Sequence, residues 1–388
     1  MKWKNKGHEF EHLKEIFTWH KPVYIYGGGG IGELVYERMK FVDCVKGFID
    51  NIKKEGPDQV KVYSSLEFLK KGEKDCIIIL AASVENMGLF KYQLLANGYE
   101  EGRDVFTYSE WIRFYMPLYF MYAWDKMYFK VLSFLCTTKC NLRCKKCLNF
   151  TTYNRHKENY DLPRLKQEID RFFEIVDYID MLHVCGGEPL LYPELPELLE
   201  YIAVRYRNRI YDLSITTNGT ILPKDELCKV LSKYHINVQL DDYRDNVPVV
   251  RETYDKVKEK FEQYNIGILF TKVEAWLDLL KDDQEQSAQT DDEEELAMQF
   301  SACNPLFKSL HNGKIYLCNF SDFAEEADMV GEHENDVFVL EDYSVDRRME
   351  FLEFMMNYSD RGYCELCKKC KGFITINGDQ CMVAEQEN

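Results

Sequence analysis

Positive charge is scarce in this sequence. Its 388 residues hold 49 Lys and Arg against 66 Asp and Glu, which gives a formal net charge of -17. A nucleic-acid partner is therefore not expected, because phosphate binding needs a basic surface. A small anionic substrate remains compatible with this charge, since it needs only a local cation or the N-terminus of a helix.

Long apolar runs are also missing. The nearest is "MPLYFMYAW" at residues 116–124, well short of the ~20 apolar residues of a membrane span. The first residues, "MKWKNKGHEF", have no apolar stretch behind their lysines, as a secretory signal would. We expect a cytoplasmic protein whose 14 cysteines mostly ligate metals or clusters rather than form disulfides.

The order of apolar and polar stretches predicts an α/β protein. Residues 1–110 contain "PVYIYGGGGIGELVYERMK", a strand, a glycine loop and a helix, and predict a small Rossmann-like domain with a parallel sheet. The expected divisions after it are an aromatic linker (111–129), a second α/β domain (130–280), an acidic connector (281–298) and a cysteine-rich domain held by a metal centre (299–388).

Residues 130–280 contain five short strands separated by amphipathic helices, among them "KVLSFLC", "YIDMLHVC" and "YDLSITT". Repeated βα units of this length predict a parallel barrel or part of one, with its chemistry on the loops that follow the strands. Cys140 to Cys147, Gly186 to Pro189, and Asn218 with Gly219 all occupy such loops.

The loop "CNLRCKKC" carries Cys140, Cys144 and Cys147 in a C-x3-C-x2-C pattern. A structural zinc site needs four protein ligands, and this loop offers only three cysteines. Cys136 lies within the preceding strand, and nothing about the spacing of His156 makes it a fourth ligand. A [4Fe-4S] cluster held by three thiolates keeps one iron open to a small molecule. Zinc and a purely structural or electron-transferring cluster remain alternatives.

This spacing resembles the radical S-adenosylmethionine (radical SAM) superfamily, whose CxxxCxxC motif follows the first strand of a partial (β/α)6 TIM barrel. Three further stretches resemble its later motifs in the right order: "GGEP" at 186–189, "TTNGT" at 216–220 and "VQLDDY" at 238–243. The resemblance implies that the three cysteines hold a [4Fe-4S] cluster and that S-adenosylmethionine (SAM) chelates its open iron. Reductive cleavage then yields a 5'-deoxyadenosyl radical that abstracts hydrogen from substrate. It also implies a low-potential electron donor such as flavodoxin or ferredoxin.

The resemblance assigns SAM contacts residue by residue. They are Gly186, Gly187, Glu188, Pro189, Asn218 and Asp241. Two positions depart from the family pattern. Lys146 replaces a usual aromatic ring near the adenine, and Asp241 stands where a serine is usual, so the adenine and carboxylate contacts are less well defined than the cluster ligands.

A second set of cysteines occupies the last hundred residues. Cys303 and Cys318 form C-x9-G-x4-C, which resembles the auxiliary-cluster domains (SPASM and the shorter twitch form) of radical SAM enzymes. Cys367 and Cys370 are expected to complete one auxiliary [4Fe-4S] cluster, with Cys364 as a substitute for one of them. A zinc ribbon is the alternative.

The glycine loop holds Gly27, Gly29 and Gly32 in G-x-G-x-x-G, and Asp50 ends the next strand. This pattern predicts a nucleotide site, with the phosphate at the helix N-terminus and the carboxylate on a ribose. It also resembles the N-terminal domains of sugar-modifying acyltransferases and polysaccharide-biosynthesis proteins. A docking domain without ligand and true NAD redox chemistry are the alternatives.

Substrate contacts are expected from His183, Tyr243 and Arg244, with a satisfied core histidine and surface placement as the opposing interpretations. The leading hypothesis is a radical SAM enzyme that dehydrogenates, epimerises or rearranges a sugar, nucleotide-sugar or glycan precursor. The alternatives are a peptide or protein maturase and a non-catalytic Fe-S or zinc-binding protein.

Overall fold

The computed structural model describes residues 1–17, 20–281 and 292–387. The chain forms two compact units, one of Phe10–Tyr128 and one of Met1–Glu9 together with Phe129–Asn388. Within the described ranges, no helix has the length and apolar character needed to cross a membrane. The acidic connector expected at 281–298 falls largely on 282–291, outside the described residues.

The smaller unit is built on a five-stranded sheet in the order β3-β2-β1-β4-β5. All four strand pairings are parallel. The strands are β1 Val23–Tyr26, β2 Val45–Ile49, β3 Val62–Tyr63, β4 Ile77–Leu80 and β5 Val105–Thr107. The helices are α1 Lys14–Phe17, α2 Gly30–Met39, α3 Ser65–Lys71, α4 Val84–Ala96, α5 Tyr108–Glu110 and α6 Met116–Trp124. This is the strand order with which doubly wound nucleotide-binding sheets begin.

Two sequence features account for this arrangement. Every residue of β1 and β4 is buried, as expected for central strands covered on both faces. The aromatic stretch expected as a linker belongs to this unit, where it forms a π-helix, Trp111–Tyr115, and then α6, most of whose side chains are buried.

The larger unit contains an eight-stranded sheet in the order β10-β9-β8-β7-β6-β12-β13-β14. Its strands are β6 Tyr128–Thr137, β7 Tyr178–Gly186, β8 Ile210–Thr217, β9 Asn237–Asp241, β10 Ile268–Thr271, β12 Lys308–His311, β13 Lys314–Tyr316 and β14 Val337–Val339. Strands β7 to β10 pair in parallel, and β12 is parallel to β6. Strands β13 and β14 run antiparallel. A separate pair joins β11 Trp276–Leu277 to β15 Gln380–Cys381.

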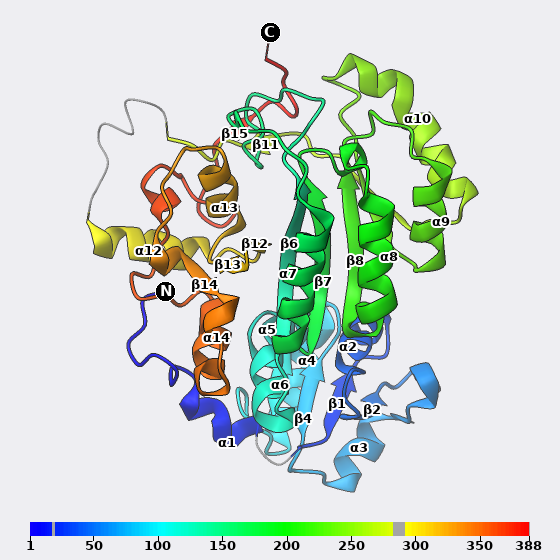
Figure 1. Cartoon of the computed structure of the whole chain (residues 1–388). Helices are drawn as coiled ribbons and strands as arrows, with labels where there is room; N and C mark the ends of the chain where they lie inside the picture. Colours follow the sequence, from blue (N-terminus) through cyan, green and yellow to red (C-terminus); the bar gives the residue numbers. More distant parts are fainter. Residues whose placement is uncertain (18–19, 282–291, 388) are drawn as a thin grey trace. The chain divides into compact units, whose positions relative to one another are not determined.

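Helices connect the parallel strands and cover their outer face, where Figure 1 shows α7 and α8 in front of β6 to β8. The connecting helices are α7 Leu162–Ile175, α8 Leu195–Tyr206, α9 Asp225–Lys233 and α10 Pro248–Gln263. The later helices are α12 Glu293–Cys303, α13 Asn319–Glu326 and α14 Arg348–Met355. Apolar side chains such as Leu182, Leu213 and Val238 are fully buried beneath this layer, while the alternate positions face the inside of the curved sheet.

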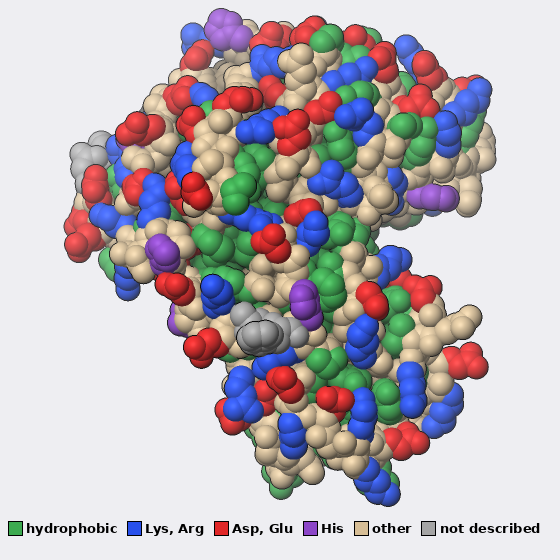
Figure 2. Space-filling view, turned by 60° about the horizontal axis from the view of Figure 1, so that its bottom comes forward, with side chains coloured by type: hydrophobic (Ala, Val, Ile, Leu, Met, Phe, Trp, Pro, Cys, Tyr) green, Lys and Arg blue, Asp and Glu red, His purple; other side chains and the backbone are tan. Residues whose placement is uncertain are grey.

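The prediction of a mixed α/β fold with parallel sheets and a partial barrel is confirmed. The expected five consecutive βα strands are β6 to β10, and the sixth parallel strand, β12, is added beside β6 rather than after β10. The barrel is therefore open at β10. On the face seen in Figure 2, the described Lys and Arg side chains are mixed with Asp and Glu and form no broad basic field.

Candidate active site

The first cysteine loop begins where β6 ends. Cys140, Cys144 and Cys147 are all at least half-buried, and burial raises the pKa of Cys140 and Cys144 to about 12. The Cys147 thiolate raises both values further, so the three sulfurs share one electrostatic environment. Buried thiols become ligands only when a metal replaces their protons.

Three thiols are the number that a four-iron cube with one open iron needs. Among the described residues, no three His, Cys, Asp or Glu side chains converge on one metal position. A cube binds each thiolate through a different iron, so its ligands surround a volume rather than a point. Cys136 is separate from the set: it is fully buried in β6, and its thiol donates to the Cys185 carbonyl at 3.4 Å.

The glycines of "GGEP" press against the start of the cysteine loop. A Cβ on Gly186 would lie 2.3 Å from the Thr137 carbonyl oxygen, and one on Gly187 would lie 2.3 Å from the Lys139 carbonyl oxygen. The Gly187 and Glu188 N–H groups donate to those carbonyls at 2.9 and 2.8 Å. Only glycine permits this approach. Pro189 follows, buried in the first turn of a 3-10 helix, Pro189–Leu191.

The Glu188 carboxylate joins the second and third motifs. One oxygen accepts from the Thr217 hydroxyl at 2.9 Å, the other from the Asn218 backbone N–H at 2.8 Å, and the Leu190 N–H donates at 3.1 Å. Burial raises its pKa to about 7, against the effect of these donors. The carboxylate thus links the two motifs inside the protein, and the contact of Gly186, Gly187, Glu188 and Pro189 with SAM stays a prediction.

Asn218 carries the third motif to the cluster loop. Its side-chain amide donates to Asn141 at 3.1 Å and lies 3.9 Å from the Cys140 sulfur. Its carbonyl oxygen accepts from the Thr220 N–H at 3.0 Å. The motifs after β6, β7 and β8 therefore meet at Cys140.

A polar lining covers the inner face of the partial barrel. His183 on β7 is held by Ser214 at 3.0 Å and Thr216 at 2.8 Å, both on β8, and burial lowers its pKa to about 4. Gln239 on β9 is paired in register with Thr216 and donates to Asp241 at 3.2 Å. His183 is therefore neutral near pH 7, with both ring nitrogens engaged, and its contact with substrate stays a prediction.

Asp241 and Tyr243 lie close to the cysteine loop, whereas Arg244 is held elsewhere. The Tyr243 hydroxyl donates to Asp241 at 2.8 Å, and burial, followed by Asp241 and then Cys144 and Cys147, raises the tyrosine pKa. Arg244 makes a two-point contact with Asp242, at 2.9 and 2.8 Å, and its guanidinium lies over Tyr254. Its guanidinium is thus already paired with Asp242, and the contact of Arg244 with substrate stays a prediction.

A segment far along the chain, residues 383–387, covers the cysteine loop. The Gln386 amide donates to the Cys144 sulfur at 3.2 Å, and its carbonyl oxygen accepts from the Arg143 N–H at 2.8 Å. Glu385 and Glu387 pair with Lys145 at 2.5 Å and Arg143 at 3.0 Å. The sequence-based interpretation missed this segment, although Glu385 and Glu387 have the same spacing as their partners Lys145 and Arg143.

Lys146, at the position where the family pattern has an aromatic ring, is also tied to distant residues. Its ammonium donates to both oxygens of Asp278 at 2.9 Å. Asp278 follows β11, and its N–H donates to the Asp379 carbonyl oxygen at 2.9 Å, just before β15. Lys146 therefore anchors the cysteine loop to the β11–β15 pair.

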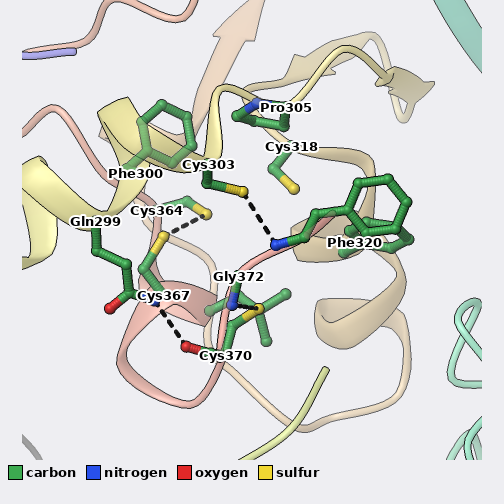
Figure 3. A pocket seen from close by; sticks show the side chains of 12 residues that line it. Gln299, Phe300, Cys303, Pro305, Cys318, Phe320, Cys364, Cys367, Cys370 and Gly372 are labelled. Atoms are coloured by element: carbon green, nitrogen blue, oxygen red, sulfur yellow. Dashed lines mark hydrogen bonds between the residues drawn. The ribbon is translucent and has the colours of Figure 1, made fainter. Parts of the chain in front are cut away.

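The second set of cysteines lines one apolar cavity (Figure 3). Its five cysteines are Cys303, Cys318, Cys364, Cys367 and Cys370. The Cys364 and Cys367 sulfurs are 3.5 Å apart. Backbone N–H groups of Phe373 and Gly372 donate to the sulfurs of Cys303 and Cys370 at 3.3 and 3.2 Å.

The cavity fits a sulfur-ligated cluster, because hydrogen bonds to sulfur and an apolar surround are the shell that such clusters have. The four predicted auxiliary ligands and Cys364 are all brought together. Cys381 is placed apart, in β15 opposite Trp276.

The glycine loop of the smaller unit is closely packed by its own chain. Gly27 has φ +116° and no room for a Cβ against the Ala81 carbonyl, and Gly32 has none against the Gly27 carbonyl. Gly29 caps α2 with open space around it. Asp50 accepts the Gly28 N–H at 2.8 Å and the Ile52 and Lys53 N–H groups at 2.8 and 2.9 Å.

These contacts define the state of Asp50. Burial raises its pKa, but the three backbone donors and the charge of Lys53 together outweigh burial and leave the pKa below its usual value. The Lys53 ammonium donates to the Gly28 carbonyl oxygen at 2.8 Å. Both carboxylate oxygens of Asp50 are therefore engaged inside the loop, and its contact with a ribose stays a prediction.

Among known protein families, the Radical SAM superfamily matches this chain over residues 134–266. A probable GTP 3',8-cyclase of Methanococcus aeolicus is 34% identical over 119 residues, which cover 29% of this chain and 37% of that protein. The GTP 3',8-cyclase of Syntrophomonas wolfei is 35% identical over 108 residues, 27% of this chain and 32% of that protein. The chain thus spans about a third of the length of these relatives.

Solved structures give weaker likenesses. The anSMEcpe structure with bound AdoMet and Kp18Cys peptide has a TM-score of 0.41 at 14% identity, covering 66% of this chain and 94% of that one. The BtrN structure with AdoMet and 2-DOIA has a TM-score of 0.39 at 16% identity, covering 64% and 94%. At this level neither carries an argument about the reaction.

Proposed function

We propose that this chain, whose residues 134–266 belong to the radical SAM superfamily, is an enzyme that cleaves SAM reductively and abstracts hydrogen from a polar small molecule. The observation that carries the proposal is that Glu188 links the motifs around the cysteine loop. It fixes Thr217 and Asn218, while its own backbone N–H is bonded to Lys139 beside Cys140. Three separate motifs are thereby held around one set of three thiols.

Cys140, Cys144 and Cys147 would hold the [4Fe-4S] cluster. The proposed SAM contacts are Gly186, Gly187, Glu188, Pro189, Asn218 and Asp241. When bound, the cluster and SAM supply a 5'-deoxyadenosyl radical for hydrogen abstraction. The chain's own residues position and shield this chemistry. Segment 383–387 covers Cys144, and the neutral His183 and its hydroxyl partners present hydrogen-bonding groups inside the barrel.

The cavity of five cysteines supports one auxiliary cluster. Four thiolates complete a [4Fe-4S] cube, so one sulfur of the five is in excess. Cys303, Cys318, Cys367 and Cys370 remain the proposed ligands, with Cys364, 3.5 Å from Cys367, as the substitute for a neighbour. Such a centre would accept or pass on an electron as the substrate radical is resolved.

A hydroxyl-rich substrate, such as a sugar or nucleotide-sugar, suits the lining formed by His183, Ser214, Thr216, Gln239 and Asp241. The hydroxyl, amide and carboxylate groups around His183 can donate to or accept from a substrate hydroxyl group. The relatives named as GTP 3',8-cyclases favour a nucleotide as the second candidate. In the smaller unit, the engaged Asp50 supports a docking role over a nucleotide handle.

The enzymatic proposal is tested by anaerobic reconstitution of the full chain. We expect about eight irons per chain, four for each cluster, and 5'-deoxyadenosine formation that depends on dithionite. The Cys144→Ala variant should form none, while Cys228→Ala, which changes a buried cysteine of α9, should retain it. Iron binding without any 5'-deoxyadenosine in the unsubstituted chain would leave a non-catalytic iron-sulfur protein.

The substrate class is tested by the rate of 5'-deoxyadenosine formation. A substrate should raise this rate well above the slow cleavage seen without it, and deuterium from a labelled substrate should enter 5'-deoxyadenosine. We expect stimulation by nucleotide-sugars or free sugars, and GTP is the direct test of the second candidate. Stimulation by peptides alone would replace this proposal with a maturase.

A further inference from the structure

Lys308, on β12, is a lysine enclosed near the second set of cysteines. Only 2% of its surface is exposed. Its ammonium donates to the Leu317 carbonyl oxygen at 2.7 Å and to the Asn357 side-chain oxygen. Leu317 directly precedes Cys318, so the ammonium lies against the backbone that carries a proposed ligand.

The side-chain amide of Asn357 is oriented toward Lys308 by the residues that follow Cys303. Its nitrogen donates to the Asn304 side-chain oxygen at 2.7 Å and to the Pro305 carbonyl oxygen at 3.0 Å. The amide oxygen is therefore the atom left for Lys308. Asn304 and Pro305 directly follow Cys303, so a single network links Lys308 to the backbone beside both Cys303 and Cys318.

This lysine has neutral hydrogen-bond partners but no paired negative charge. Within the described part of the chain, its hydrogen bonds are those to Leu317 and Asn357, and no carboxylate forms an ion pair with it. Burying an unpaired ammonium is costly. Burial lowers its pKa to about 7, Lys130 acts in the same direction, and the thiolates of Cys318, Cys364 and Cys303 oppose them.

We propose that Lys308 is the buried counter-charge of the auxiliary cluster and that it raises the reduction potential of that cluster. The inference rests on the auxiliary cluster proposed above. Four thiolates around a [4Fe-4S] centre give the cavity a net negative charge, which increases when the cluster accepts an electron. A protonated Lys308 beside the Cys303 and Cys318 segments favours the reduced state, because net charge around a cluster sets its potential. Lys308 is a positioning residue here, since it acts through the cluster and touches no substrate.

The experiment is an EPR-monitored redox titration of the reconstituted full chain carrying Cys144→Ala, so that the auxiliary cluster titrates alone. Lys308→Met and Lys308→Gln remove the charge, and glutamine keeps a donor for the Leu317 carbonyl. Lys308→Arg keeps the charge. We expect both neutral variants to lower the equilibrium constant for reduction at least tenfold, about 59 mV for one electron, and the arginine variant to shift it less.

The outcomes separate this inference from the proposed function. Fewer than about two irons per chain in the Cys144→Ala background would overturn the auxiliary cluster itself. A full cluster with an unchanged potential in Lys308→Met and Lys308→Gln would overturn only the counter-charge. If both neutral variants lose the cluster while Lys308→Arg keeps it, the charge is required to hold the anion, which supports the inference. Equal loss in all three variants would assign Lys308 to packing alone and overturn it.

Discussion

The two cysteine sites differ in what surrounds their sulfurs. The loop of Cys140, Cys144 and Cys147 receives side-chain amide groups from Gln386 and Asn218 and lies near the polar lining around Tyr243. The cavity lined by Cys303 to Cys370 is instead apolar, with Phe300, Phe320 and Phe373 in its wall and Lys308 behind it. The first site offers fewer thiols than a four-iron cluster has corners, and the second offers more.

Under the proposed function, this difference would give the two sites different roles. A cluster with an open iron beside polar side chains is accessible to a second molecule and suits catalysis. A cluster with a full thiolate set in an apolar wall is shielded from solvent, which suits the storage or transfer of an electron. Each prediction below changes one side of this comparison.

Replacing the cysteines of one site should abolish the cluster of that site and leave the other cluster intact. We expect Cys303→Ala with Cys318→Ala to reduce iron from about eight to about four per chain while 5'-deoxyadenosine formation without substrate persists. The variant with alanine at Cys140, Cys144 and Cys147 should keep about four irons and form no 5'-deoxyadenosine. Iron analysis and product chromatography measure both. Loss of SAM cleavage in the first variant would show that the two sites are not separate.

Within the cavity, the fifth sulfur offers a finer version of the same test. Cys364→Ala should keep the full auxiliary iron content if Cys367 and Cys370 are both ligands. Cys370→Ala is the matched comparison, since both cysteines lie three residues from Cys367. Iron loss in Cys364→Ala with retention in Cys370→Ala would transfer the ligand role from Cys370 to Cys364.

Local pattern was enough to predict what lies on the loops. Parallel strands present their C-terminal ends at one edge, so "GGEP" and "TTNGT" had to approach the cysteine loop. The pattern also placed Cys136 in its strand, where it is fully buried. The sequence pattern could not predict which partners each side chain contacts. The hydrogen bonds of the Glu188 carboxylate to Thr217, Asn218 and Leu190 were not predictable from the motif, and its contact with SAM stays a prediction.

Contacts between residues far apart in the chain could not be predicted from the sequence. Gln386 is 242 residues from Cys144, and no spacing rule links a glutamine to a thiol at that separation. Lys308 stands in "KSLH", where nothing distinguishes a buried lysine from a solvated one. Arg244 was the opposite case, because the acids of "DDYRD" beside it were a visible sign that it would be paired locally.

Glu188 makes the stability of the loop site depend on pH. Its pKa is raised by burial from 4.5 to about 7. Below pH 4.5 the carboxyl is protonated in the folded and the unfolded chain alike. Between pH 4.5 and about 7, the unfolded chain releases this proton while the folded chain keeps it. The folded state therefore loses up to about 3 kcal/mol of stability across this range, and the loss is complete above pH 7.

Glu188→Gln should remove this slope. Urea unfolding of the cluster-free chain at pH 5 and pH 8 measures it, with Glu197→Gln on the exposed face of α8 as the matched control. We expect the unfolding free energy of the unsubstituted chain to fall relative to Glu188→Gln as pH rises, and the control to follow the unsubstituted chain. A constant difference between the chain and Glu188→Gln would mean that Glu188 is ionised throughout, held by its three donors.

The smallest predicted effect concerns the amide of Gln386. A hydrogen bond to a cluster sulfur stabilises the reduced, more negative state, and a typical bond contributes about 1 kcal/mol. Gln386→Leu should therefore lower the potential of the loop cluster by about 40 mV for one electron. The potential is read by EPR titration in the Cys303→Ala and Cys318→Ala background, with Gln380→Leu, an exposed glutamine of β15, as control.

The presence or absence of this shift in potential separates two roles for segment 383–387. If the segment only excludes water, Gln386→Leu keeps that cover, and Gln386→Leu and Gln380→Leu give the same potential. If the N–H to sulfur bond at 3.2 Å acts as we expect, only Gln386→Leu shifts. The loop cluster would then be tuned by a neutral dipole and the cavity cluster by a buried charge, and the Lys308 variants should shift their cluster further than Gln386→Leu shifts its own.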